Sequence, residues 1–240
     1  MKDQQMYALA QGLSDILGFG RVLHLVRVSM SDTEQRWSGA ILFRCNVTYT
    51  GGQTGTMIFK EAPYKERMAM ETLTRQGHRN TPAAFSLDLK TPSPCWMALE
   101  DVGKSAVFPA SVNRVAEVSD ALARIHVLNM GRGPEMPWLP HADPAYWKDF
   151  LIRQLSVDHF EARMKEDMNF ANEFGDYLPL LRDKAESFAS DMSALYAEKE
   201  YLTLTHGDLQ TADGPHIQFH HSKPYIIDFG WCHYAPFYID

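Results

Sequence analysis

Residues 202–210 read Leu-Thr-Leu-Thr-His-Gly-Asp-Leu-Gln, and residues 224–230 read Pro-Tyr-Ile-Ile-Asp-Phe-Gly. In each stretch an apolar run with strand character leads into an aspartate, Asp208 in the first and Asp228 in the second. Because a hairpin joins the two strands, both carboxylates can reach one site. Phosphoryl transfer needs such a pair, since one carboxylate holds a divalent cation and the other orients the attacking hydroxyl.

The composition is that of a globular protein with a proper core. The chain has 240 residues, of which 45% are apolar and 22% charged, and its net charge is −7. A nucleic-acid binder normally carries a basic surface, so we expect no nucleic-acid partner. No stretch approaches the length of a membrane span, and the N-terminus lacks the features of a signal peptide, so we expect no membrane association.

The three cysteines are an odd number without paired spacing (Cys45, Cys95 and Cys232). Such usage is typical of a reduced protein with no disulfide framework, and it predicts a cytoplasmic location. Nothing in the sequence implies an obligate protein partner.

The N-terminal part has the pattern of a small antiparallel sheet. Residues 41–49 alternate with a period of two, Gly51-Gly52 supplies a turn, and residues 56–61 form the returning strand. The other elements predicted here are helices over residues 3–17 and 63–76 and strands over residues 23–29, 85–89 and 96–100.

After Gly103 the pattern becomes helical. Residues 111–129 place apolar side chains on one helical face, and residues 145–199 are largely helical as well. We therefore predict a β-rich, nucleotide-binding lobe over residues 1–102 and a helical lobe with the catalytic and metal-binding loops over residues 103–240.

Lys60 ends an apolar strand, and Glu66 follows six positions later in the next helix. An ion pair between them would hold the lysine ready for phosphate oxygens. The alternative is an exposed lysine and a glutamate stabilised by the dipole of the helix N-terminus. The two residues alone leave both interpretations open.

The complete order of motifs along the chain is more specific than the pair of Lys60 and Glu66. Lys60 and Glu66 are followed by the strand that ends in Glu100, by Leu-Ala-Arg-Ile-His at residues 122–126, and by the His-Gly-Asp and Ile-Asp-Phe motifs. From about residue 20 to the last residue, this series resembles the aminoglycoside phosphotransferase and choline-kinase-like family of small-molecule kinases.

The resemblance implies an α+β, protein-kinase-like fold of two lobes and the transfer of phosphate from ATP to a hydroxyl of a small molecule, with Mg²⁺ as cofactor. The acceptor would be an aminoglycoside or another alcohol. Asp208 would orient or deprotonate its hydroxyl, and Asp228 would chelate Mg²⁺. Lys60 would contact the α- and β-phosphates, and Glu66 would hold Lys60.

The resemblance also predicts where the rest of the nucleotide binds. Backbone groups around Glu100 and Val102 would read the adenine edge. The loop over residues 31–39 would cover the phosphates, although it lacks the usual glycine pattern.

The second metal ligand departs from the family pattern. An asparagine usually follows the aspartate of the His-Gly-Asp motif by five positions, and here that count reaches Asp213. Gly214-Pro215 do not begin a strand, so aligning on the strand at residues 216–219 places His216 in this position. Macrolide-kinase-like members are similar in having a histidine there, and we choose His216 over Asp213. Imidazole suits Mg²⁺ poorly, which raises the alternative of a catalytically impaired, nucleotide-binding pseudokinase.

The end of the sequence supports the same alternative. Relatives continue with helices beyond an aspartate that Asp240 resembles, so we expect a shortened C-terminal lobe. A further alternative, a zinc hydrolase using His206, His216 and His220 or His221, has no supporting ligand spacing. For His206 we expect support of the backbone turn, with no part in proton transfer.

The helical insert at residues 145–199 would form the acceptor pocket in this family. It carries several acids (Asp158, Glu161, Glu166, Asp167, Glu173 and Asp176). They predict either an acidic lining for a polycationic acceptor or a solvated helix face.

Overall fold

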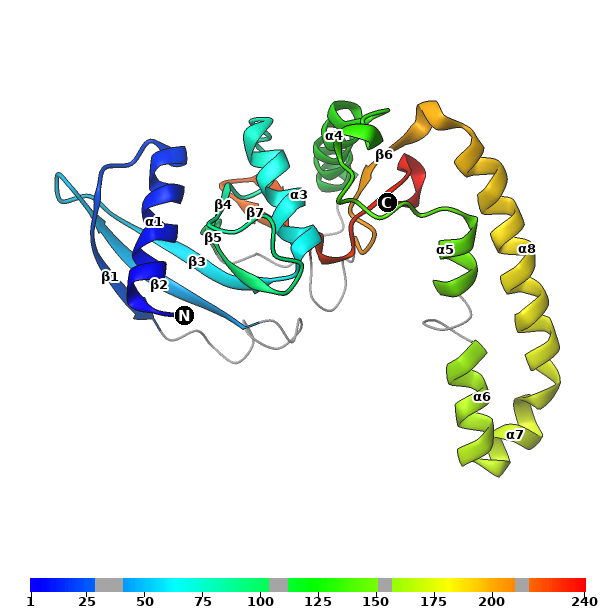
Figure 1. The fold of residues 1–240 in the computed structure, drawn as a ribbon. Coiled ribbons are helices and arrows are strands. Elements are labelled where there is room, and N and C mark those ends of the chain that lie inside the picture. Colours follow the sequence, from blue (N-terminus) through cyan, green and yellow to red (C-terminus); the bar gives the residue numbers. More distant parts are fainter. Residues whose placement is uncertain (29–40, 104–111, 151–156, 210–215) are drawn as a thin grey trace. The chain divides into compact units, whose positions relative to one another are not determined.

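The computed structural model describes residues 1–28, 41–103, 112–150, 157–209 and 216–240. The chain forms two compact units, which are coloured along the sequence in Figure 1. Unit 1 comprises Met1–Leu128, His206–Cys232 and Asp240, and unit 2 comprises Asn129–Thr205 and His233–Ile239. The predicted catalytic, nucleotide-binding and metal-binding residues belong to unit 1 (Lys60, Glu66, Glu100, Val102, Asp208, His216 and Asp228), whereas the insert expected to form the acceptor pocket belongs to unit 2. The lobe boundary expected after residue 102 stays a prediction.

Unit 1 is built on a five-stranded antiparallel sheet with the order β1-β2-β3-β5-β4. Its strands are β1 (Val22–Val28), β2 (Leu42–Tyr49), β3 (Thr54–Ala62), β4 (Ala84–Ser86) and β5 (Cys95–Glu100). The register pairs Lys60 with Leu42 on one side and with Met97 on the other, so Lys60 lies in the central strand.

One face of this sheet packs against helix α1 (Asp3–Leu17). Successive side chains of a strand point to opposite faces, so every second residue of β2 and β3 enters this core. The buried cluster combines helix and sheet residues (Leu9, Leu13, Phe43, Cys45, Val47, Met57 and Phe59). Because Phe59 points toward α1, its neighbour Lys60 points to the opposite face.

The other elements of unit 1 are the helix α3 (Tyr64–Arg75), most of α4 (Val112–Asn129) and the hairpin of β7 (Ile217–His220) and β8 (Lys223–Ile226). A short 3-10 turn, η5 (Phe229–Trp231), follows the hairpin. Asn80, just beyond α3, accepts the amide of Ile226 at 2.7 Å and donates to the carbonyl of Pro224 at 3.0 Å. These bonds fix the loop after α3 to β8.

The strand predicted over residues 85–89 is shorter than expected, because β4 ends at Ser86. The carboxylate of Asp88 accepts the amides of Lys90 at 2.8 Å and Thr91 at 2.9 Å. Such side-chain capping turns the backbone away from a ladder. The apolar pattern predicted the strand, but this local turn overrides its last residues.

Unit 2 is mainly helical (Figure 1). Its elements are η1 (Gly133–Glu135), α5 (Pro144–Asp149), α6 (Val157–Glu166), α7 (Met168–Phe174), η3 (Gly175–Tyr177), α8 (Leu178–Ala197), η4 (Lys199–Tyr201), β6 (Leu202–Thr205), β9 (His233–Pro236) and η6 (Phe237–Ile239). The buried residues of α8, Ala185, Ala189 and Met192, lie on one stripe of the helix. Among the described helices, none is long and apolar enough to cross a membrane.

Arg67 fixes the first turns of α3. It is 1% exposed, and its guanidinium donates to the carbonyls of Ala62 at 2.7 Å, Asp88 at 3.2 Å, Thr91 at 2.5 Å and Ser93 at 3.0 Å. Five N–H donors in a rigid fork suit such a set of acceptors. The helix that carries Glu66 is thereby attached to the segment before β5.

We expect Arg67→Met to lower the free energy of unfolding by more than about 3 kcal/mol, because each buried acceptor left without a donor costs about 1–3 kcal/mol. Urea denaturation followed by circular dichroism measures this change. The control is Arg75→Met at an exposed position of the same helix, which should change stability by less than about 0.5 kcal/mol. Similar small losses in both variants would contradict the role assigned to Arg67.

Candidate functional site

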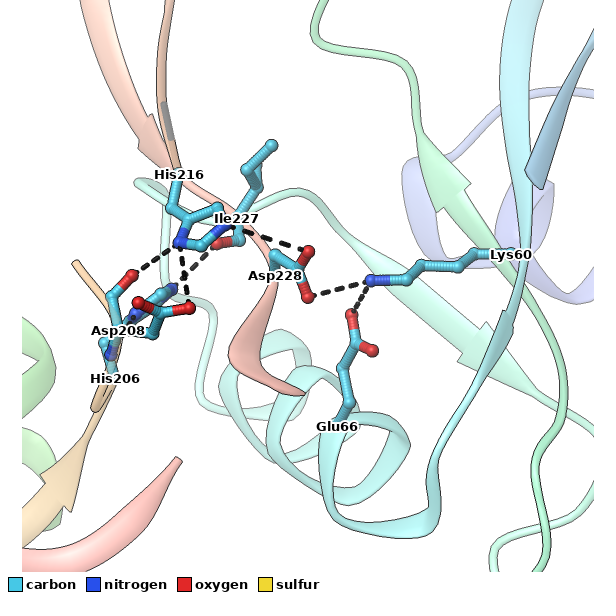
Figure 2. Close-up of polar contacts among 7 residues, drawn as sticks. All are labelled: Lys60, Glu66, His206, Asp208, His216, Ile227 and Asp228. Atoms are coloured by element: carbon cyan, nitrogen blue, oxygen red, sulfur yellow. Dashed lines mark hydrogen bonds and ion pairs between the residues drawn. The ribbon is translucent and has the colours of Figure 1, made fainter. Parts of the chain in front are cut away.

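A buried lysine lies between two carboxylates in unit 1. Figure 2 shows the side chain of Lys60 reaching from β3 toward Glu66 on α3 and Asp228 after β8. The Lys60 Nζ atom is 2.6 Å from Glu66 Oε1 and 2.9 Å from Asp228 Oδ1. Lys60 is 7% exposed and Glu66 is 2% exposed, so both charges are shielded from water. Of the two interpretations left open by the sequence, the structure has the buried ion pair.

The charges of Lys60, Glu66 and Asp228 shift one another's pKa values. Burial alone would lower the pKa of Lys60, but Glu66 and Asp228 outweigh it and raise that pKa above its usual value. Burial opposes ionisation of Asp228 too, yet the neighbouring ammonium brings the pKa of Asp228 below its usual value. Burial raises the pKa of Glu66, against the attraction of Lys60. At neutral pH the ammonium of Lys60 therefore faces the ionised carboxylate of Asp228.

Asp228, which pairs with Lys60, has an uncommon backbone conformation. Asp228 has a left-handed conformation with φ of 65°, which aspartate adopts more readily than most residues. A Cβ atom at Gly230 would lie 3.3 Å from Asp228 Oδ1. A side chain there would crowd the carboxylate, so glycine at this position leaves room for the ion pair.

His206 joins the two aspartate loops through the backbone. Its Nδ1 atom accepts the amide of Asp208 at 3.3 Å, which leaves Nε2 to donate to the carbonyl of Ile227 at 2.8 Å. The ring is fully buried and packs against Phe229 at 4.7 Å between ring centroids. Burial lowers its pKa and keeps the ring neutral. These contacts are those of a residue that supports the turn.

The sequence did not identify Asp240 as part of this site. Its Oδ2 atom accepts the amide of His206 at 2.7 Å and its Oδ1 atom accepts the amide of Gly207 at 2.8 Å. The Nε2 atom of His126, on α4, lies 3.0 Å from Asp240 Oδ2. The Asp240 carboxylate is fully buried. Its two hydrogen bonds fix the turn before Asp208. No motif spacing connects Asp240 with this turn, because the contact arises only in the folded chain.

His216 lies between the two site aspartates. Its Nδ1 atom is 2.5 Å from the backbone oxygen of Asp208 and 3.9 Å from Asp208 Oδ2. Its Nε2 atom is 4.0 Å from Asp228 Oδ2. The side chains of His216, Asp208 and Asp228 are 20%, 26% and 28% exposed, so incoming molecules can reach them. The competing ligand candidate, Asp213, lies outside the described residues.

The five predicted residues Lys60, Glu66, Asp208, His216 and Asp228 therefore form one linked group (Figure 2). Among the residues that the structure describes, no set of three or more His, Cys, Asp or Glu side chains is placed to hold a metal ion by itself. Any cation here would take its remaining ligands from water or from a bound phosphate.

Glu100 and Val102 lie beyond this group, at the end of β5. Glu100 pairs with Met57 of β3, three residues from Lys60, which is a distance of roughly 10 Å along a strand. The Glu100 side chain accepts the amide of Ala83 at 3.1 Å. Asp101 binds Arg44 of β2 at 2.6 Å and the amide of Gly103 at 3.0 Å. Side-chain contacts of Glu100 and Asp101 thus anchor this segment. The loop over residues 31–39, expected to cover the phosphates, lies outside the described residues.

Unit 2 contains an open hollow of about 600 Å³ between α6, α7 and α8. Its lining is largely aromatic and includes none of the six acids expected in this insert (His159, Phe160, Arg163, Phe170, Phe174, Tyr177 and Leu181). Glu161 pairs with Arg182, and Asp167 pairs with Arg163 at 2.9 Å. Asp167 also caps α7 by accepting the amides of Asn169 and Phe170. Two of the acids thus have structural roles, and this hollow gives no acidic lining.

We expect Asp240→Ala to speed hydrogen exchange at the amides of His206 and Gly207, because both lose their carboxylate acceptor. Loss of a charge-assisted bond worth about 1.5–3 kcal/mol predicts exchange faster by about tenfold or more at each amide. NMR exchange measurements resolve the two positions. Asp191→Ala, at an exposed position of α8, is the control. Unchanged exchange in Asp240→Ala would contradict the support assigned to Asp240.

No protein-family model matches the sequence, and no curated protein matches it. A solved spectinomycin phosphotransferase, APH(9)-Ia, in complex with ADP and spectinomycin, is similar over 100% of this chain and 72% of that chain, with a TM-score of 0.56 and 13% identity. Macrolide 2'-phosphotransferase MphH from Brachybacterium faecium aligns with 95% of this chain and 73% of that chain, with a TM-score of 0.46 and 13% identity. At the level of the fold, the first comparison confirms what the sequence predicts: the chain has the protein-kinase-like fold of the aminoglycoside phosphotransferases.

Proposed function

We propose that this protein is an ATP-dependent phosphotransferase that acts on a hydroxyl of a small molecule. The observation that carries the proposal is the chain of contacts from Lys60 through Asp228 and His216 to Asp208. It places an ammonium, a carboxylate with an oxygen facing His216 and a second, accessible carboxylate in one group. Phosphoryl transfer requires positioning and charge stabilisation of this kind more than covalent chemistry.

Lys60 is the phosphate-binding cation in this proposal. Its stem is held by the sheet and its ammonium by Glu66, so little side-chain entropy is lost when a phosphate oxygen binds. Backbone groups of Glu100 and Val102 read the adenine edge. Asp101 and Glu100 are already anchored by Arg44 and by the amide of Ala83, which keeps this segment in one conformation.

Asp228 and His216 are the residues that would hold the Mg²⁺ ion that ATP carries, with the Asp228 carboxylate as the preferred oxygen ligand and the His216 imidazole as the weaker one. Asp228 Oδ2 and His216 Nε2 face each other at 4.0 Å, and Asp228 Oδ1 remains with Lys60. When bound, the ion neutralises charge that develops on the phosphates. The two residues would hold and orient it, and phosphate oxygens and water would supply its remaining ligands.

Asp208 orients the acceptor hydroxyl and takes its proton. Its backbone is fixed by His206 through the amide and by His216 through the carbonyl. The turn before it is held by Asp240. With its backbone fixed, the carboxylate meets the acceptor in a defined position, which is how a general base gains efficiency.

The acceptor is a small molecule with a free hydroxyl, such as an aminoglycoside or another alcohol. Support comes from the fold shared with the spectinomycin phosphotransferase, whose structure contains ADP and its antibiotic. We place the reaction in the cytoplasm, where ATP is available and where the free thiols of Cys45, Cys95 and Cys232 stay reduced. We propose no obligate protein partner.

A catalytically impaired pseudokinase is the second candidate. The observation that favours it is His216, an imidazole where an oxygen ligand would suit Mg²⁺ better. Stabilisation by Mg·ATP without turnover on a panel of aminoglycosides, macrolides and simple alcohols would support this candidate. Turnover on any of them would exclude it.

We expect Asp208→Asn to lower kcat by about 10²–10⁴-fold, the usual contribution of a positioned acid or base. ADP affinity should stay within about twofold, because Asp208 contacts the acceptor in this proposal. Phosphate transfer measured with radiolabelled ATP, together with calorimetry for ADP, separates the two effects. The control is Asp183→Asn on α8, at an exposed position. Full activity in Asp208→Asn would overturn the role of Asp208.

We expect Asp228→Ala to weaken binding of Mg·ADP by about tenfold or more, since one cation ligand and one partner of Lys60 are lost. Binding of ADP without Mg²⁺ should change much less, because Lys60 keeps Glu66 as a partner. Calorimetric titrations with and without Mg²⁺ provide the comparison. An equal loss in both titrations would show that Asp228 acts only on Lys60 and does not bind the ion.

A further inference from the structure

The hydrogen-bonding state of His216 is fixed by the backbone. Its Nδ1 atom lies 2.5 Å from the carbonyl oxygen of Asp208, and a carbonyl oxygen can only accept. The proton of a neutral ring is therefore on Nδ1, and Nε2 carries a lone pair. Histidines that bind metals are prepared in the same way, by a hydrogen bond from the second ring nitrogen to a carbonyl or carboxylate.

The lone pair of Nε2 faces another electron donor. In Figure 2 the ring of His216 directs Nε2 toward Asp228, and the distance to Oδ2 is 4.0 Å. This distance is too long for a hydrogen bond. Metal–ligand bonds of about 2.0–2.2 Å from each atom would span it. The geometry thus presents one nitrogen and one oxygen donor to a shared position.

The nearby carboxylates do not convert this position into an all-oxygen site. Asp228 Oδ1 is 2.9 Å from the ammonium of Lys60, and Glu66 Oε1 is 2.6 Å from the same ammonium. The carboxylate of Asp208 lies on the Nδ1 side of the ring, with Oδ2 at 3.9 Å from that nitrogen. Within the described residues, His216 Nε2 and Asp228 Oδ2 are the donors that face each other.

We propose that His216 and Asp228 form a mixed imidazole–carboxylate site that selects transition-metal cations such as Mn²⁺ and Co²⁺ over Mg²⁺. The inference rests on the proposed function, since the phosphates of the nucleotide complete the shell. Mg²⁺ prefers oxygen ligands and loses its water reluctantly. The affinity of nitrogen-containing sites rises from Mn²⁺ to Co²⁺ along the first transition row. An imidazole in the shell therefore favours these ions more than an amide oxygen would.

Pulsed electron paramagnetic resonance of Mn²⁺ with ADP and the protein tests the direct bond. Protein labelled with ¹⁵N only in histidine, with unlabelled ADP, should show a ¹⁵N coupling to Mn²⁺. The coupling should vanish in His216→Asn. It should persist in the control, His221→Asn, because His221 is exposed at the hairpin tip with a φ of 48° that asparagine tolerates. Should His216→Asn fail to fold, the absence of any ¹⁵N coupling in the wild type would still overturn the bond.

Displacement of bound Mn²⁺ by Co²⁺ or Mg²⁺, followed by the free Mn²⁺ signal, tests the selectivity. In the wild type we expect Co²⁺ to displace Mn²⁺ at a much lower concentration than Mg²⁺. The ratio of these two concentrations should shrink by about tenfold in His216→Asn. Mn·ADP binding without histidine coupling, or with an unchanged ratio in the variant, would overturn this inference and leave nucleotide binding intact. Failure to bind ADP with any of the three ions would overturn the proposed function as well.

Discussion

The buried ammonium of Lys60 is the interaction on which the rest of the site depends. Removing a charge from water costs several kcal/mol unless partners and hydrogen bonds compensate it. Here the partners come from different parts of the chain, Glu66 on α3 and Asp228 after β8. The fold must therefore bring the sheet, the helix and the hairpin together before this lysine can be buried. The lysine that we propose to bind phosphate can therefore be buried only when these parts of unit 1 are correctly assembled.

The turn before Asp208 is held by a second buried charge. The carboxylate of Asp240 satisfies two adjacent amides and lies beside His126. Arg67 performs a similar task for α3 by satisfying four carbonyls. In each case a charged side chain satisfies backbone groups, most of which lie outside the helices and strands. These two charges thus support the backbone around the candidate site.

The sequence predicted the elements with strong periodicity. The motif residues that it singled out lie together in the structure, and their functional roles stay predictions. The alternation in residues 41–49 predicted β2. Phe59 is buried against α1, so the next residue, Lys60, points to the opposite face of the sheet. The contacts of Asp240 and Arg67 could not be predicted, because they join residues with no characteristic spacing. The strand expected over residues 85–89 was too long, because propensity does not foresee the turn that Asp88 closes.

The charge of the assembled group explains why the cation and the nucleotide should bind together. One ammonium (Lys60) and three carboxylates (Glu66, Asp208 and Asp228) give a net charge of −2 when all are ionised and His216 is neutral, from +1 and −3. A nucleotide without a metal is itself a polyanion and would be repelled by this group. A divalent cation at the proposed site of Asp228 and His216 would cancel the net charge, so each ligand should raise the affinity of the other by the same factor. Because the His216 imidazole would connect a bound cation to the backbone of Asp208, occupancy of the cation site would also affect the position of the proposed base.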